Sequence, residues 1–215
     1  TQAMEKGVYS FCMCPGGIIA PCATDQEEVV TNGWSPSKRN NPYANSGIVV
    51  SIEPKDLDNS DHPLCGLDFQ KSIERSAWVA AGKNQQVPAQ RLLDFMNHKK
   101  SKDFPRSSYQ PGITSVEMDE VFPKFITSRL RKAFLDFNKK IPGFVSQDAV
   151  LHAPESRTSS PVLIPRNKEN YAHVELENLY PCAEGAGYAG GIVSAAIDGM
   201  NCVQAIKSEF ETNQI

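Results

Sequence analysis

Short hydrophobic runs alternate with turn-forming residues through the first third of the chain. β-branched residues are frequent in these runs, and Pro15-Gly16-Gly17 and Asn32-Gly33 separate them. The pattern predicts a small, mainly antiparallel sheet. The expected strands are 8–12, 18–22, 28–31 and 47–52.

The middle of the chain changes to a helical period. Phe69, Ile73, Ala77 and Ala80 share one face of a segment that stops at Gly82. Two more helices are expected, over 89–97 and over 122–139, and the second has a strongly apolar face. The polar stretch 98–112 between them is rich in Ser, Lys and Pro, and it is interpreted as an exposed loop.

The last part of the chain returns to short apolar runs and then to a helix. Strands are expected over 149–152, 161–164 and 179–182, followed by a glycine-rich turn and a helix over 191–209. The face of this helix that is expected to be buried consists of Ile192, Ala195, Ala196, Gly199, Val203 and Ile206.

Composition and charge narrow the class of protein. The chain has 215 residues, of which 40% are hydrophobic and 22% charged, as is usual for a soluble globular protein. Its net charge of -3 gives no global basic field, so a nucleic-acid partner is not expected. No apolar stretch approaches the roughly 20 residues that span a bilayer, and the N-terminus lacks signal-peptide character. A cytoplasmic protein without a membrane partner is therefore expected.

The six cysteines are interpreted as reduced thiols rather than as a disulfide framework, because a chain of this size has core residues enough. Cys12 and Cys14 form a C-M-C sequence, which differs from the C-x-x-C spacing of zinc sites, and no histidine lies nearby. We therefore expect no metal site.

The segment from Glu184 to Gly191 is the most informative for chemistry. Four of its eight residues are glycine, and a predicted helix begins directly after it. Glycines at such a turn let backbone N–H groups approach a ligand, and a helix N-terminus offers unsatisfied donors with a partial positive charge. The turn suits a phosphate or an electron-rich carbonyl edge. The alternative is that small residues here only let the helix pack closely.

A family resemblance accompanies this turn. EGAGYAGGIVSAAIDG, residues 184–199, is similar to the C-terminal flavin motif of flavoproteins with two dinucleotide-binding domains. Further segments resemble one family of FAD-dependent dehydrogenases, sometimes labelled NAD(FAD)-utilising. They are FCMCPGG at 11–17, TNGWSPSKRNNPYANSGIVV at 31–50, PAQRLLDF at 88–95, IPGF at 141–144 and ESRTSSPV at 155–162.

The resemblance implies roles for particular residues. Glu184 would contact the ribityl or ribose part of FAD, and backbone of the following residues would face the pyrophosphate or the isoalloxazine edge. These residues are Gly185, Ala186, Gly187, Gly190, Gly191 and Ile192. The substrate side of the flavin would involve Arg157, Ser159, Ser160 and Cys14. The alternatives are a capped turn with a surface arginine, and a buried thiol. The family usually has glycine where this chain has Ala183.

The expected fold class is α+β. Residues 1–150 would form a β-rich and helical cap or substrate domain, inserted into a Rossmann-like FAD-binding domain whose last strand, turn and helix are 151–215. The chain contains no G-x-G-x-x-G, so the unit that cradles the ADP half of FAD is expected in another, N-terminal part of the parent protein, its expected partner. The chain alone would then bind FAD weakly or not at all.

The resemblance implies hydride transfer through FAD on a small-molecule substrate. Two alternatives stay open at this point. One is a non-catalytic domain that binds a ligand or a protein, and the other is part of an RNA-modifying flavoprotein.

Overall fold

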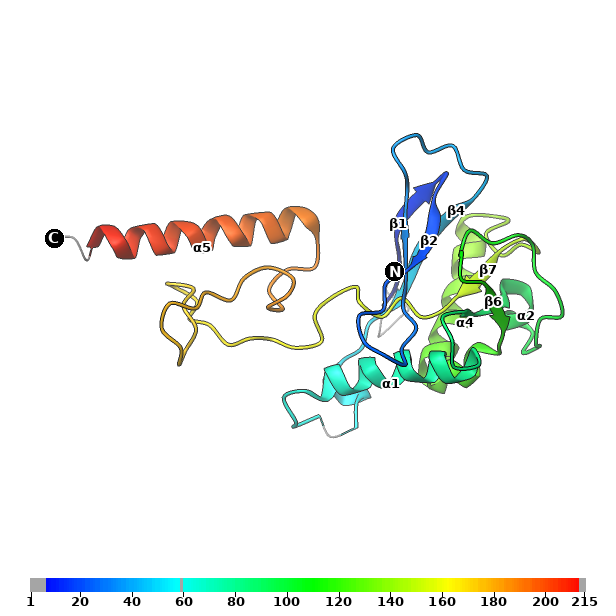
Figure 1. The fold of residues 1–215 in the computed structure, drawn as a ribbon, viewed down its shortest axis with the longest axis horizontal. Coiled ribbons are helices and arrows are strands. Elements are labelled where there is room, and N and C mark those ends of the chain that lie inside the picture. Colours follow the sequence, from blue (N-terminus) through cyan, green and yellow to red (C-terminus); the bar gives the residue numbers. More distant parts are fainter. Residues whose placement is uncertain (1–6, 59, 213–215) are drawn as a thin grey trace. The chain divides into compact units, whose positions relative to one another are not determined.

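A computed structural model describes residues 7–58 and 60–212. Small sheets and helices occur together, so the α+β prediction is confirmed. The chain divides into two compact units (Figure 1). Unit 1 comprises Thr1–Asp56 and Phe69–Ser156, and unit 2 comprises Leu57–Asp68 and Arg157–Ile215. The proposed division into a cap domain and a flavin-binding domain stays a prediction.

The first third of unit 1 forms antiparallel pairs, as the alternating pattern predicts. Strand β1 (Val8–Pro15) pairs with β4 (Ala44–Val50), and β2 (Ile18–Pro21) pairs with β3 (Thr31–Trp34). The strand expected at 28–31 begins only at residue 31. Val29 and Val30 instead lie in the core, with exposed fractions of 0% and 1%.

A third sheet was missed in large part. Strand β5 (Val87–Arg91) lies between β6 (Ile113–Ser115), which is parallel to it, and β7 (Val150–His152), which is antiparallel. Only β7 was predicted. The helix expected over 89–97 is reduced to α2 (Leu92–Met96). The first four residues of β5 are all buried, so this central strand lacks the alternation that marks a half-exposed strand.

The other helices agree better with the sequence. Helix α1 (Cys65–Ala80) ends where expected, and α4 (Lys124–Lys140) begins after Pro123, which is its N-cap. Two short elements were not predicted, the 3-10 helix η1 (Pro54–Asp56) and α3 (Met118–Val121).

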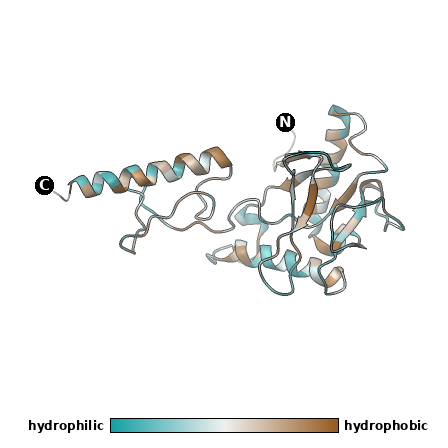
Figure 2. Cartoon of the chain, turned by 45° about the horizontal axis from the view of Figure 1, so that its top comes forward, coloured by the Kyte–Doolittle hydropathy of each residue, from teal (hydrophilic) through white to brown (hydrophobic). Residues whose placement is uncertain are grey.

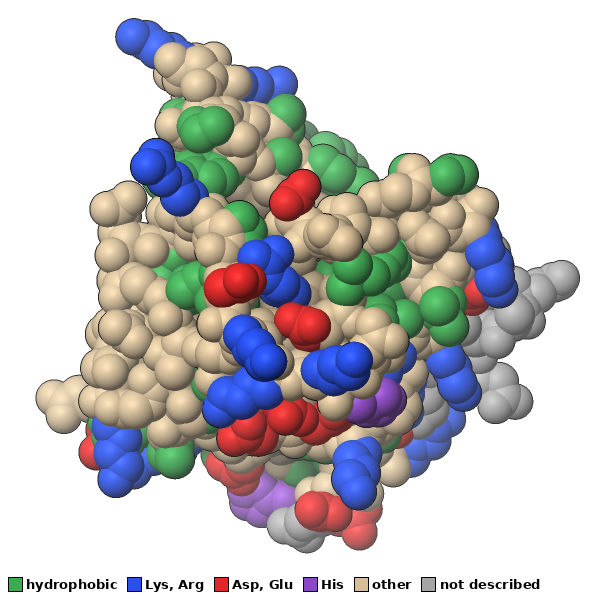
Figure 3. Space-filling view, turned by 90° about the vertical axis from the view of Figure 1, so that its right-hand side faces the viewer, with side chains coloured by type: hydrophobic (Ala, Val, Ile, Leu, Met, Phe, Trp, Pro, Cys, Tyr) green, Lys and Arg blue, Asp and Glu red, His purple; other side chains and the backbone are tan. Residues whose placement is uncertain are grey.

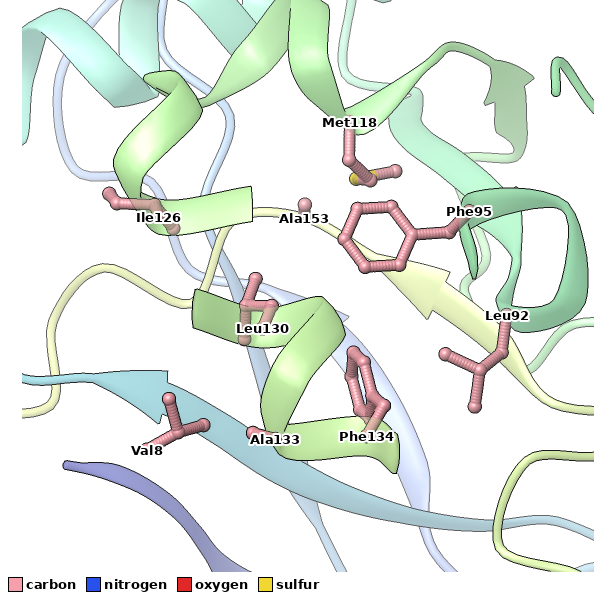
Figure 4. Packing of buried hydrophobic residues seen from close by; sticks show 9 residues of the cluster. All are labelled: Val8, Leu92, Phe95, Met118, Ile126, Leu130, Ala133, Phe134 and Ala153. Atoms are coloured by element: carbon pink, nitrogen blue, oxygen red, sulfur yellow. The ribbon is translucent and has the colours of Figure 1, made fainter. Parts of the chain in front are cut away.

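Helix α4 supplies much of the main core of unit 1 (Figure 4). Phe134 of α4 and Phe95 of α2 meet edge to face, with ring centroids 6.1 Å apart. The remaining buried members of this core are Val8, Leu92, Met118, Ile126, Leu130, Ala133 and Ala153. A second buried cluster contains Val29, Ala77, Val87, Tyr109, Val116 and Val121.

The polar stretch 98–112 is only partly exposed, which corrects the prediction of an exposed loop. Ser101, Ser108 and Tyr109 are buried. Ser101 Oγ accepts a hydrogen bond from Arg91 N at 2.8 Å and donates one to Asp94 Oδ2 at 2.7 Å. Side-chain hydroxyls therefore satisfy backbone and carboxylate groups inside the unit, a role that composition alone does not reveal.

Unit 2 has little regular structure besides helix α5 (Ile192–Thr212), which was predicted. The strands expected at 161–164 and 179–182 do not form, and the described backbone there is irregular. Apolar positions continue along α5 (Figure 2). The prediction of a buried apolar face is wrong for Ile192 and Val203, which are 92% and 64% exposed, and for Ala196, which is also exposed. The buried side of α5 instead carries Asp198 and Cys202.

Candidate functional site

The glycine-rich turn before α5 is held by its own backbone. Gly187 N donates to Glu184 O at 2.9 Å, and Tyr188 N donates to Ala183 O at 3.0 Å. Gly187 has a φ of 84°, and a Cβ there would lie 2.6 Å from Val162 O. Glycine is therefore required at position 187 by the fold of unit 2 itself.

Ala183 begins the turn in a left-handed conformation, with a φ of 59°. This conformation is unfavourable for a residue with a Cβ and easy for glycine. The position is the one at which the resembling family usually has glycine. The departure noted in the sequence therefore falls on a residue whose backbone favours the family's residue.

The segment 160–164 lies beside the turn. Ser160 Oγ donates to Val162 O at 2.8 Å and approaches Gly185 O at 3.3 Å. Ile164 N donates to Ala186 O at 3.1 Å, and the Tyr188 hydroxyl donates to Ile164 O. Two sequence segments that were predicted to serve one site are thus brought together, with Ser160 at their contact. Of the other predicted site residues in the segment 155–162, Ser159 is exposed and Arg157 is half-buried.

The Arg166–Asp198 ion pair connects the start of the turn to α5. Arg166 Nη2 lies 2.6 Å from Asp198 Oδ1, and Arg166 Nη1 donates to Pro181 O at 2.8 Å. Asp198 Oδ2 accepts a hydrogen bond from Ala183 N at 2.8 Å. The Arg166 guanidinium holds the pKa of Asp198 below its usual range, and the hydrogen bond from Ala183 acts in the same direction.

The Arg166 guanidinium also lies between two aromatic rings. It is 4.5 Å from the ring centroid of Tyr171 and 3.6 Å from that of Tyr188. Both contacts have cation–π geometry. Neither Arg166 nor Asp198 was predicted as a site residue. The two are 32 residues apart, and Asp198 had no predicted role although it lies within the resembling segment 184–199.

The remaining glycines of the turn are not explained by packing among the described residues. A Cβ at Gly185 or Gly190 would meet nothing within 4 Å, and one at Gly191 would meet only the Ser194 hydroxyl. Glu184 and Ile192 are exposed, whereas Ala186 is buried. Open glycines next to the N-terminus of a long helix fit a phosphate or a carbonyl edge of FAD. The packing alternative is supported only at Gly187.

Cys14 belongs to unit 1, where it is buried. Its thiol donates to Cys12 O at 3.1 Å, across an irregularity in the pairing of β1 with β4. Cys12 has a φ of 50° and is exposed. Burial raises the pKa of the Cys12 thiol, and the nearby Glu155 carboxylate raises it further. With this raised pKa, the Cys12 thiol is poorly suited to be a thiolate at neutral pH.

Glu155 was not singled out from the sequence as a site residue, although its surroundings are unusual. Burial raises the pKa of its carboxyl group. A Cβ at Gly47 would lie 2.7 Å from Glu155 Oε2 and equally close to the Phe11 ring. The glycine thus leaves room for a carboxylate against an aromatic ring in unit 1.

Among residues 7–58 and 60–212, no three His, Cys, Asp or Glu side chains gather as metal ligands. In the same part of the chain, no helix has the length and apolar character needed to cross a membrane. Acidic and basic side chains lie next to one another on the face of the molecule shown in Figure 3.

The fold and the turn together describe an α+β protein with an open glycine-rich turn at the start of a long helix. Residues 1–158 match the family model described as FAD-dependent protein, C-terminal domain-like, so the chain belongs to this family. The chain is also 38% identical, over 213 residues, to an uncharacterized protein of Clostridium beijerinckii. The match covers 98% of this chain and 40% of the relative's length.

Proposed function

We propose that this chain is the C-terminal part of an FAD-dependent dehydrogenase that transfers hydride through the flavin to or from a small-molecule substrate. The observation that carries the proposal is the open glycine-rich turn at the start of α5, in a chain that belongs to an FAD-dependent family. Bound FAD supplies the hydride-accepting ring, and the protein supplies orientation and electrostatics.

Each part of the turn has a proposed role. The backbone N–H groups of Gly190 and of the first turn of α5 would hold a phosphate or a carbonyl edge by hydrogen bonds. The Gly191 N–H already donates to Ser194 Oγ at 3.1 Å, so Gly191 would contribute close approach of its backbone. Exposed Glu184 would accept hydrogen bonds from ribityl or ribose hydroxyls. The Arg166–Asp198 pair would fix the turn against the helix, so that these donors are positioned before the cofactor arrives.

Helix α5 supports a second element of the proposal, a partner surface for the rest of the flavoprotein. At 100° per residue, its exposed apolar side chains fall within about 140° of the helix circumference. They are Ile192, Val193, Ile197, Met200, Val203 and Phe210. An apolar stripe of this kind marks an interaction surface. We propose that it packs against the N-terminal FAD-binding part of the parent protein, because this chain spans 40% of its relative's length.

The visible spectrum of the purified full-length gene product tests the main proposal. We expect the two absorbance bands of oxidised flavin, and their bleaching under anaerobic conditions when a nicotinamide hydride donor is added. A full-length protein that is colourless and indifferent to added FAD would contradict the proposal. It would favour the alternative of a non-catalytic binding domain.

A variant of the turn makes this test specific. Gly190→Leu places a side chain in open space, so the fold should tolerate it while flavin occupancy of the full-length protein falls at least about tenfold. The matched control is Gln204→Leu, which places the same side chain at an exposed position within α5. Equal flavin content in both variants would remove the turn from the cofactor site.

The surface on α5 needs its own test. Ile197→Asp should lower the midpoint of urea unfolding of the full-length protein but leave that of the present chain unchanged, because Ile197 is 52% exposed here. We also propose that the present chain alone binds FAD weakly, and that the parent protein works in the cytoplasm with its cysteines reduced. Titration of this chain with FAD, followed by flavin fluorescence, tests the first of these.

A further inference from the structure

Two cysteines outside the predicted site lie on either side of the junction between the glycine-rich turn and α5. Cys182 comes directly before Ala183, and Cys202 lies on the buried side of α5 with an exposed fraction of 3%. Neither of them was predicted to have a role. Both are free thiols.

The hydrogen bonds around the junction bring these two residues together. Pro181 O and Cys202 Sγ both contact Arg166 Nη1, at 2.8 and 3.5 Å. On the other side of Cys182, Ala183 N bonds to Asp198, which lies one helical turn before Cys202. The residues that flank Cys182 are therefore tied to the residues that flank Cys202.

The electrostatic setting agrees with this arrangement. Burial raises the pKa of the Cys202 thiol, the Arg166 charge opposes that shift, and a hydrogen-bonding contact with Cys182 adds to it. Cys182 is half-buried and therefore more accessible than Cys202. An external oxidant would meet Cys182 first, and Cys202 would be the resolving thiol.

We propose that Cys182 and Cys202 form a reversible disulfide that cross-links the glycine-rich turn to α5, with a small-molecule disulfide as the oxidant. The Cys182 thiolate attacks the disulfide, forms a mixed disulfide and releases one thiol. The Cys202 thiolate then attacks the Cys182 sulfur and releases the second thiol. Overall, two protein thiols are oxidised and one small disulfide is reduced to two thiols, with the two protons passing to the released thiolates. The cross-link is independent of the flavin proposal.

Oxidised glutathione is the probe. The mass of the intact protein and the masses of its peptides after non-reducing proteolysis are the readouts. We expect the loss of two hydrogens and a linked peptide pair that contains Cys182 and Cys202. The Cys202→Ser variant should instead keep glutathione on Cys182. The Cys182→Ser variant should stay unmodified at Cys202, because that thiol is buried. The matched control Cys12→Ser should cross-link like the unchanged protein.

The consequence of the cross-link is measured by amide hydrogen exchange. In the oxidised protein, exchange in 183–191 should slow by about tenfold or more, since the link removes open states of a short loop. Stable glutathione on Cys182 of the unchanged protein, with no internal link, would overturn the proposal. A linked pair that involves Cys12, Cys14, Cys22 or Cys65 instead would also overturn it.

Discussion

The two units of this protein place their apolar residues in opposite ways. Unit 1 has aromatic rings such as Phe95 and Phe134 at its centre, with exposed fractions of 0% and 1%. In the described part of unit 2, the buried apolar side chains are Pro181, Ala186 and Cys202, all of them small. Most of its large apolar residues, among them Leu163, Ile192 and Phe210, are exposed.

The difference indicates two sources of order. Burial of apolar area stabilises unit 1, as in an ordinary domain. Unit 2 depends instead on directional contacts, above all on the Arg166 guanidinium with its carboxylate, its carbonyl and its two aromatic rings. A unit of this kind retains apolar surface that another part of a larger protein can cover.

The largest effect is expected in the core of unit 1. Phe134→Ala should lower the free energy of unfolding of unit 1 by about 3–5 kcal/mol, because it leaves a cavity next to the three aromatic rings that contact Phe134. Trp34 and Trp78 both belong to unit 1, so urea unfolding followed by tryptophan fluorescence reports on this unit alone. The neighbouring control Leu135→Ala is 54% exposed and should change the value by less than about 0.5 kcal/mol. Similar losses in both variants would show that unit 1 lacks a specific core.

The next effect concerns the anchor of unit 2. Arg166→Met should destabilise this unit by about 2–3 kcal/mol, since it leaves the Asp198 carboxylate without its partner next to solvent. Hydrogen exchange of peptides from 160–200 should speed up, while the tryptophan transition of unit 1 stays unchanged. Lys168→Met removes the same charge from an exposed position and serves as the control. A shift of the tryptophan transition in Arg166→Met would mean that the two units do not unfold separately.

Acid should act on the same anchor. The pKa of Asp198 is lowered in the folded state, so its contribution to stability is complete above the usual aspartate value of about 3.9. That contribution is lost as the pH falls from there through the lower pKa of the folded protein. We expect exchange in 183–191 to rise over this acidic range in the unchanged protein and to depend less on pH in Arg166→Met. Equal pH dependence in the two proteins would place the titrating group elsewhere.

Periodic elements could be predicted from the sequence, and elements defined by burial could not. Helix α4 has an apolar face and a proline at its N-terminus, and both are visible in the sequence. Strand β5 does not alternate, because Val87 to Gln90 are buried on both faces of the sheet, and Val87 is its one β-branched residue. The preference of its last residues for helix was therefore overridden by tertiary contacts.

The candidate site shows the same limit. Its glycine-rich turn was found because glycine frequency is a local signal. The Arg166–Asp198 pair, the thiols of Cys182 and Cys202, and the contact of Ser160 with Gly185 depend on distant segments that meet only in the folded chain. The buried face of α5 was mispredicted because hydrophobicity alone does not say which side of a helix its own unit covers.

A smaller effect of opposite sign is expected at the start of the turn. Ala183→Gly should stabilise unit 2 by about 1 kcal/mol, because Ala183 has a φ of 59°. Slower hydrogen exchange in 183–191 is the measurement. The same replacement at Ala196, an exposed position within α5, should destabilise the helix by about 1 kcal/mol. If both replacements destabilise unit 2, the backbone at position 183 is not strained.

The smallest expected change in stability tests whether the side of α5 around Gly199 is exposed. Gly199→Ala should stabilise the present chain by about 0.5–1 kcal/mol, because alanine favours a helix interior and the new Cβ meets nothing within 4 Å. Gly187→Ala is the contrasting control, since its Cβ would lie 2.6 Å from Val162 O at a φ of 84°. The midpoint of thermal unfolding, followed by the circular dichroism of the helix, should rise for Gly199→Ala and fall for Gly187→Ala. Gly199→Ala should also stabilise the full-length protein less than the present chain, if the neighbouring apolar stripe is covered there. An equal gain in both proteins would mean that the side of α5 around residue 199 stays free, and that the covered surface is narrower than proposed.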